Sequence, residues 1–422
     1  MNDELLADLV RAHWWGAVGT VTRLVGDIGV AEDAVQEACL AAVRQWPRDG
    51  VPANPSSWLI GAAHHKALDW VRREARRGER ELQATRDAAA DGAAAAPAPV
   101  GDDQLALVFT CCHPALDPAV RVPLTLRAVC GLRTAQIAAV FLIPEPTMAQ
   151  RLVRAKRKIR EAGIAFRVPP PELLQDRLAD VLQVVYLMFT EGHRASAGYS
   201  LNNEELCQAA VRLARRLREL IVDEPEVDAL LALLLLADAR RPARTDSSGR
   251  LVLLGDQDRR LWDGEMIREG LGLLEDALSQ RRPGPYQLQA AIAACHATAA
   301  DLASTDWQQI AALYDRLWAE DPSPVVAANR AVAIAMIEGP EAGLELLDEL
   351  AKAPAIQRWG ALHIARGELL HRLGRDADAA RAYRRATELQ LPEPERRLIN
   401  HRITTINETG RSTTDMGSGV RS

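Results

Sequence analysis

Hydrophobic residues recur every three or four positions along most of the chain, the spacing of one face of an α-helix. Within residues 30–46, for example, the apolar stripe consists of Val35, Ala38, Cys39, Ala42 and Trp46. Ala, Leu and Arg are abundant, and only 4% of the 422 residues are aromatic. Such small and straight-chain residues lose little rotamer freedom in a helix. The sequence therefore predicts an all-α protein.

Two breaks in this pattern divide the chain. Residues 84–101 are rich in Ala and Pro and have almost no large apolar side chain, which is typical of a linker. The run Pro169-Pro170-Pro171 cannot continue a helix. We therefore expect a helical domain at 1–80, a flexible linker at 81–102, a second helical domain at 103–168, a helical middle domain at 169–284, helical repeats at 285–405 and a disordered tail at 406–422.

The predicted repeats have small residues at positions where two antiparallel helices approach each other. Residues 362–391 contain Gly367, Ala379 and Ala386 with Tyr383 between them, the order of a tetratricopeptide repeat. A weaker copy lies about 36 residues earlier, close to the usual period of about 34. The alternative is a set of ordinary helical hairpins.

The segment 132–160 has the spacing of a helix-turn-helix. Thr134 can cap a short helix that runs through Phe141, and Pro146 can open a second helix after a short turn. In the second helix Leu152, Ala155 and Ile159 are expected to face inward. We expect the outward face to carry polar and basic side chains that read DNA bases and hold phosphates: Glu145, Thr147, Met148, Arg151, Arg154 and Arg157. A solvated surface or a membrane-surface helix is the alternative.

The first predicted domain presents two polar helix faces. The helix at 30–46 has an acidic face with one apolar residue, formed by Asp33, Gln36, Glu37 and Leu40. The helix at 58–77 carries cations that can follow a phosphate backbone, together with Trp58 and Trp70. Both tryptophans can stack on unpaired bases, or both can belong to the core.

Charge and composition narrow the function. The formal net charge is −6, with +2 through Arg167 (21 basic against 19 acidic residues) and −8 after it (30 against 38). Nucleic-acid binding is therefore expected only at local basic patches. No apolar stretch approaches the roughly 20 residues of a membrane span, so we expect a cytoplasmic protein. The six cysteines lack metal-site spacing, and even Cys111-Cys112-His113 has no second half-site, so no metal is expected.

The chain resembles the extracytoplasmic-function (ECF) sigma factors of the sigma-70 family. Segments 31–47 (AEDAVQEACLAAVRQWP) and 54–73 (NPSSWLIGAAHHKALDWVRR), followed by the helix-turn-helix, are similar to the two globular regions of these factors. Further segments, among them 184–196 (VVYLMFTEGHRAS) and 251–263 (LVLLGDQDRRLWD), resemble the subgroup with a tetratricopeptide-containing C-terminal extension.

The resemblance implies roles for particular residues. Asp33, Gln36, Glu37 and Leu40 would bind the core RNA polymerase. The minus-10 promoter element would be bound and melted by Trp58, His64, His65, Lys66, Asp69, Trp70, Arg72 and Arg73. The minus-35 element would be bound by Thr134, Glu145, Thr147, Met148, Arg151, Arg154, Lys156 and Arg157. Promoter DNA and the polymerase would be the partners, and an unidentified protein or small ligand could bind the extension, which would regulate activity in cis. No cofactor is implied.

Two other classes of function are possible. An enzyme would need a catalytic group, and Glu191, His193, Asp256, Asp258 and Asp263 do not show spacing that demands acid–base chemistry or metal binding. We therefore expect no enzyme. A one-component transcriptional regulator, with the repeats as sensor, would bind DNA without joining the polymerase.

Overall fold

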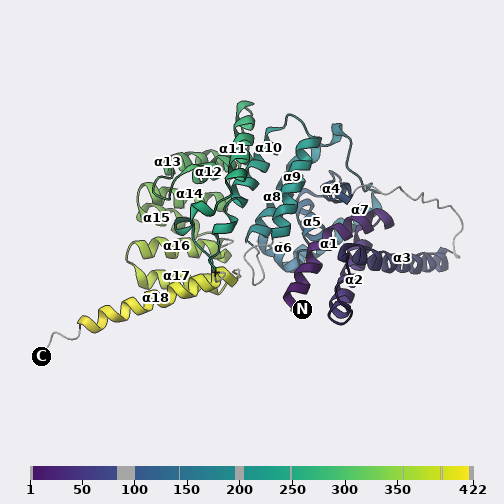
Figure 1. Ribbon diagram of the computed structural model, residues 1–422, viewed down its shortest axis with the longest axis horizontal. Helices are drawn as coiled ribbons and strands as arrows, with labels where there is room; N and C mark the ends of the chain where they lie inside the picture. The colour runs from purple at the N-terminus through teal and green to yellow at the C-terminus, as the bar shows by residue number, and fades with distance from the viewer. Residues whose placement is uncertain are drawn as a thin grey trace. The chain divides into compact units, whose positions relative to one another are not determined.

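The computed structural model confirms an all-α protein (Figure 1). It describes residues 3–82, 100–141, 143–194, 204–247, 250–354, 356–389, 391 and 393–417. In these ranges the β-structure is a single antiparallel bridge between Thr245 and Leu251. The chain forms two compact units, Met1–Met188 and Phe189–Ser422.

The first unit contains two groups of helices. The first group packs α1 against both α2 and α3, and the second group packs α5 against α4, α6 and α7. Helix α8 begins in this unit. The bounds of these helices are α1 Asp3–Val25, α2 Ile28–Asp49, α3 Pro55–Leu82, α4 Val100–Cys111, α5 Pro118–Cys130, α6 Thr134–Val140, α7 Glu145–Glu161 and α8 Gln175–Arg194.

Helix α1 also packs against α4 and α5, so the two groups form one unit. The indole Nε1 of Trp14 donates to the Ala128 carbonyl oxygen over 3.2 Å. Gly131 ends α5 with φ +64°, and a Cβ there would lie 3.1 Å from the Trp14 ring. Only glycine meets both the backbone angle and the close approach at this point.

The second unit consists mainly of antiparallel helix pairs in succession (Figure 1). After α9 and α10 come short 3₁₀ turns and then α11 to α18. The bounds are α9 Glu204–Leu220, α10 Pro225–Asp238, η2 Arg241–Ala243, η3 Leu254–Asp256, η4 Arg259–Leu261, α11 Gly264–Ser279, α12 Pro285–Thr298, α13 Trp307–Glu320, α14 Pro324–Ile337, α15 Pro340–Leu350, η5 Ile356–Arg358, α16 Gly360–Arg372, α17 Asp376–Thr387 and α18 Glu393–Gly417.

Small residues stand where these pairs approach most closely. A Cβ on Gly343 in α15 would lie 2.5 Å from the Ala335 side chain in α14, and one on Gly367 in α16 would lie 2.5 Å from the Tyr383 ring in α17. Tyr383 is fully buried, and its hydroxyl donates to Glu368 over 3.1 Å. The small positions singled out in the sequence therefore serve helix packing.

Three predicted segment limits differ from the structure. Residues 406–417, expected to be disordered, continue α18 as a regular helix. The predicted linker overlaps the end of α3 at 81–82 and the start of α4 at 100–102, whereas 83–99 lie outside the described residues. The expected boundary at 168 falls inside the first unit, which extends to Met188 because the start of α8 packs on α4 and α5 through side-chain contacts. Residues 418–422 also lie outside the described residues.

Candidate polymerase and nucleic-acid interface

Helix α2 presents the predicted acidic face to solvent. Asp27 precedes the helix and its carboxylate accepts from the Gly29 and Val30 amides, which satisfies the otherwise unpaired first turn. The stripe of Val35, Ala38, Ala42 and Trp46 is buried, and Cys39 is partly buried. The opposite side exposes Asp33, Gln36 and Glu37, and Leu40 keeps 52% of its surface exposed. An exposed leucine among acids is suited to contact a basic protein surface with an apolar centre.

Helix α3 carries the residues predicted for the minus-10 element. His65, Asp69 and Arg72 are exposed, and His64 and Lys66 are partly exposed. The Lys66 ammonium donates to the Glu37 carboxylate of α2 over 2.7 Å, so the basic and acidic faces adjoin. Arg73 lies in α3, but its side chain is outside the described part of the chain.

The two predicted stacking tryptophans have different surroundings. Trp58 is partly buried, and its ring meets the buried Trp46 edge to face, with centroids 5.5 Å apart. Trp70 remains 43% exposed. Trp70 therefore has the accessible ring that base stacking requires, whereas Trp58 also supports the core.

Helices α6 and α7 form the predicted helix-turn-helix, with α7 as its second helix. Thr134 is the first residue of α6, and Pro146 lies in the first turn of α7. Leu152, Ala155 and Ile159 are buried, as predicted. Glu145, Thr147, Arg154 and Arg157 are exposed and Arg151 is partly exposed, so a row of polar side chains runs along the outer face of α7.

The prediction that Met148 faces outward is wrong. Its side chain is fully buried at 0% exposure. Position 148 precedes Leu152 by four residues, which places the two side chains on the same inward stripe. Met148 therefore holds α7 in the domain core and cannot reach a base edge in this arrangement.

Lys156 differs from the other cations of α7 because the acid it pairs with is buried. Its ammonium lies 2.5 Å from the carboxylate of Glu32 in α2, which is 1% exposed. Arg127 of α5 lies 3.7 Å from the same carboxylate oxygen. Burial raises the pKa of the Glu32 carboxyl, although Lys156 and Arg127 lower it in part. Lys156 therefore neutralises a buried acid in this arrangement and is not available to a phosphate.

A second ion pair connects the same two helices near their ends. Arg160 of α7 donates to Asp27 over 2.6 Å, while Asp27 also caps α2. Sequence reasoning missed Asp27, Glu32, Arg127 and Arg160. The position of Glu32 on the buried stripe of α2 was a signal, but its partner lies 124 positions away and nothing local identifies it.

Two of the carboxylates weighed for an enzyme, Asp258 and Asp263, have structural roles. Asp263 accepts from the Glu265 and Met266 amides and caps α11, and Asp258 accepts from the Arg260 amide at η4. His193 stacks on Phe189 with ring centroids 5.2 Å apart. Among the described residues there is no group of three metal-ligating side chains, and none of the described helices is long and apolar enough to cross a membrane. Cys111, Cys112, Cys130 and Cys207 are buried and form no disulfide bond, whereas Cys39 and Cys295 are partly exposed.

Comparison with known proteins matches three parts of the chain to families. Residues 9–77 match Sigma-70 region 2, residues 106–159 match Sigma-70 region 4, and residues 177–278 match a family of unknown function, DUF6596. The first two ranges contain the faces of α2 and α3 and the helix-turn-helix. The third covers most of the helices between α8 and α11.

One relative is similar over most of this chain, and the others are similar over little more than a third of it. An uncharacterized protein R00370 of Rhizobium meliloti is 43% identical over 378 residues, which cover 88% of this chain and 89% of the relative. The probable ECF RNA polymerase sigma factor SigI of Mycobacterium tuberculosis is 36% identical over 166 residues, 38% of this chain and 57% of the relative. ECF RNA polymerase sigma factor SigK of Mycobacterium ulcerans is 29% identical over 150 residues, 34% of this chain and 76% of the relative. No solved structure matches the chain.

The two sigma regions occur in the order and at the positions where the structure has the polar faces and the helix-turn-helix. The helical part that follows is shared with the Rhizobium meliloti relative, whose similarity covers most of both chains. The chain belongs to the sigma-70 family, as an RNA polymerase sigma factor of the ECF type with a helical C-terminal extension.

Proposed function

We propose that this sigma factor binds core polymerase through α2, melts the minus-10 element with α3 and reads the minus-35 element with α7, while its C-terminal extension regulates these steps in cis. The polymerase contacts are Asp33, Gln36, Glu37 and Leu40. The protein acts in the cytoplasm, and polymerase and promoter supply the rest of the initiation machinery. The helix pairs of the extension, with Gly343 and Gly367 at their closest approaches, serve as a tetratricopeptide-type scaffold.

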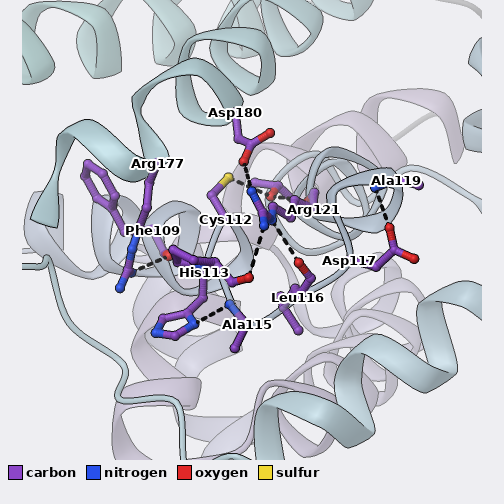
Figure 2. Close-up of polar contacts among 12 residues, drawn as sticks. Phe109, Cys112, His113, Ala115, Leu116, Asp117, Ala119, Arg121, Arg177 and Asp180 are labelled. Carbon is purple, nitrogen blue, oxygen red and sulfur yellow. Dashed lines mark hydrogen bonds and ion pairs between the residues drawn. The ribbon is translucent and has the colours of Figure 1, made fainter.

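Regulation in cis is supported chiefly by how the extension begins. Its first long helix, α8, packs on the same domain that carries the helix-turn-helix. The Arg121 guanidinium of α5 lies 2.7 Å from the Asp180 carboxylate of α8, and both side chains are largely buried (Figure 2). Arg177 of α8 donates to the Phe109 carbonyl of α4 over 2.9 Å. We call the helices α4 to α7, which include the helix-turn-helix, the DNA-reading domain. A movement of the extension can therefore act on this domain through α8.

The experiment is run-off transcription by purified core polymerase with variants of this contact. Asp180→Arg places two cations together, so we expect it to change promoter-dependent transcription severalfold. The double variant Arg121→Asp/Asp180→Arg restores the opposite charges and should return the rate toward that of the parent. Gln183→Arg, at an exposed position of α8, serves as the control for added charge. Equal rates for Asp180→Arg and the control would contradict coupling through α8.

A one-component regulator is the second candidate function, favoured only by the presence of a helix-turn-helix together with a long extension. It would bind promoter DNA without core polymerase. The same assay separates the two, because a one-component regulator supports no run-off transcript with core polymerase alone.

A further inference from the structure

A cavity of about 280 Å³ lies in the first unit at the junction between the DNA-reading domain and the extension. Its walls come from three segments: the turn after α4, residues 162–167 directly after α7, and the residues that lead into α8. The volume lies just below the range of sites for drug-sized molecules, roughly 300 to 1,000 Å³. The space therefore suits a small molecule.

The charged side chains that line this cavity are basic. Arg167 and Arg177 contribute to the wall, and none of the described Asp or Glu residues does so. His113 also lines the cavity, but burial and the charges of Arg177 and Arg121 lower the pKa of its imidazole, so it adds no charge at neutral pH. The carboxylate of Asp180 is engaged by Arg121, and Asp117 accepts from the Ala119 amide (Figure 2). Asp176, whose charge raises the pKa of Arg177, is exposed and does not line the cavity. The cavity therefore has an excess of positive charge.

Arg177 has a hydrogen-bonding capacity that the described part of the protein leaves unused. The residue is only 8% exposed, and its Nη1 donates to the Phe109 carbonyl oxygen. Its buried Nε has no hydrogen-bond partner. Burial is the largest cause that lowers the pKa of the Arg177 guanidinium, and the charge of Arg167 adds to it. A buried guanidinium with few hydrogen bonds to the protein is stabilised by an anion placed beside it.

The remaining wall is apolar. Ile164, Pro169 and Leu173 line the cavity together with alanine side chains. A fully hydrated ion such as inorganic phosphate gains nothing from such a surface, whereas a molecule with a short hydrocarbon part does. The wall thus favours an anion with an apolar body.

We propose that this cavity binds a small organic carboxylate, with the carboxylate on Arg177 and Arg167 and the hydrocarbon part against Ile164, Pro169 and Leu173. The ligand would contact the segment that ends α7 and the segment that begins α8 at the same time. If the extension regulates in cis, the bound carboxylate is a signal for that regulation. The binding site itself does not depend on that proposed function.

The test measures binding by isothermal titration calorimetry on the full chain, with butyrate, benzoate and inorganic phosphate as probes at constant ionic strength. We expect butyrate or benzoate to bind saturably and phosphate to bind more weakly. Arg177→Gln and the exposed Arg167→Gln should each weaken carboxylate binding about tenfold or more, since each removes a charged hydrogen bond. Arg167→Gln keeps the test valid if loss of Arg177 impairs folding.

The matched control is Arg133→Gln, an exposed arginine of the same domain that contacts Gln136 outside the cavity. It should bind the carboxylates like the parent. The proposal is overturned if neither carboxylate saturates the parent, if the cavity variants bind like the control, or if phosphate binds at least as tightly as the carboxylates. Run-off transcription with the tightest probe is read separately: an unchanged rate with intact binding contradicts the role of the carboxylate as a signal, whereas regulation in cis is tested by the Asp180→Arg variant.

Discussion

Two neighbouring cations of α7, Lys156 and Arg157, should respond differently to DNA because only one of them holds a buried acid. Arg157 is exposed and pairs with Glu161 one turn away, at 3.5 Å. Lys156 holds the buried Glu32 at 2.5 Å. A cation that contacts a phosphate releases condensed counterions, and this makes binding depend on salt. Exposure and pairing, rather than residue type, therefore decide which cation acts on DNA.

We predict that Arg157→Gln flattens the salt dependence of minus-35 duplex binding by about one unit of slope and weakens all sequences alike. Lys156→Gln should leave the slope unchanged, because in the parent protein Lys156 stays paired with Glu32 when DNA binds and so contacts no phosphate. Fluorescence anisotropy over a series of salt concentrations measures both slopes. If both variants flatten the salt dependence equally, DNA binding breaks the pair of Lys156 with Glu32. If Arg157→Gln does not flatten the salt dependence, Arg157 does not contact a phosphate.

The acidic face of α2 gives a second prediction at the residue scale. Asp33→Arg/Glu37→Arg should leave the helix folded, since both side chains are exposed, and should weaken association with core polymerase because the face would repel a basic surface. The control is Asp49→Arg, an exposed acid at the end of the same helix. Surface plasmon resonance with immobilised core polymerase measures the affinities. If the double variant binds as tightly as the control, α2 does not use this face.

At the scale of the element, Met148 is expected to decide whether α7 stays docked. Truncation of a fully buried methionine removes packing and leaves a cavity, which costs about 2 to 5 kcal/mol. Met148→Ala should therefore increase hydrogen exchange of the α6 and α7 amides. Val153→Ala, which changes a side chain on the same helix that is 67% exposed, should leave the exchange rates nearly unchanged. Similar exchange in both variants would show that the packing of Met148 does not stabilise the helix-turn-helix.

The buried face of a helix was predictable from the sequence wherever its apolar residues form a single stripe. Leu152, Ala155 and Ile159 face inward as the spacing requires, and the same spacing should have placed Met148 with them. Contacts between elements were not predictable, because charge pairing across the fold has no local signal. The pair of Glu32 and Lys156 is one example, and the attachment of α8 through Arg121 and Asp180 is another. The first compact unit continues to Met188, beyond the boundary expected at 168, for the same reason: proline marks where a helix stops, not where a compact unit ends.

At the scale of the whole molecule, stability should depend on pH through His296 in α12. Burial, with the charges of Arg240 and Arg259, lowers the pKa of His296 to about 4. An unfolded histidine titrates near 6.5. Between these values the unfolded chain binds a proton that the folded chain does not, so stability is complete above about pH 6.5 and falls as the pH drops toward 4. The full loss amounts to about 3 kcal/mol.

His296→Gln should remove this part of the pH dependence. Urea unfolding of the second unit, followed in the full chain at pH 7 and at pH 5, compares the parent with the variant. We expect the parent to lose more stability than the variant on going to pH 5. If the parent and the variant lose the same free energy of unfolding between pH 7 and pH 5, His296 is not a buried neutral group in the folded protein.

The last prediction concerns how much of the extension the sigma domains need. A cut after Arg167 follows the proline run, but it removes Arg177 and Asp180, which contact α4 and α5. We expect fragment 1–167 to be less stable than fragment 1–194, which keeps all of α8 and extends beyond the first unit. Fragment 1–194 is therefore the proper test of regulation in cis, since it removes most of the acidic extension while retaining the contacts of α8 with the DNA-reading domain.

With core polymerase in excess and equal concentrations of binding-competent sigma factor, fragment 1–194 should transcribe at a rate that differs severalfold from the full chain. The physical reason is that α8 is bonded to α4 and α5 and leads into the extension, so a force that the extension transmits along α8 would be lost in the fragment. Thermal unfolding of both fragments measures the stability that Arg177 and Asp180 provide, and so separates a folding defect from a regulatory effect. Equal transcription by fragment 1–194 and the full chain, at low and at moderate salt, would mean that α8 is a passive attachment and that the extension only docks a partner.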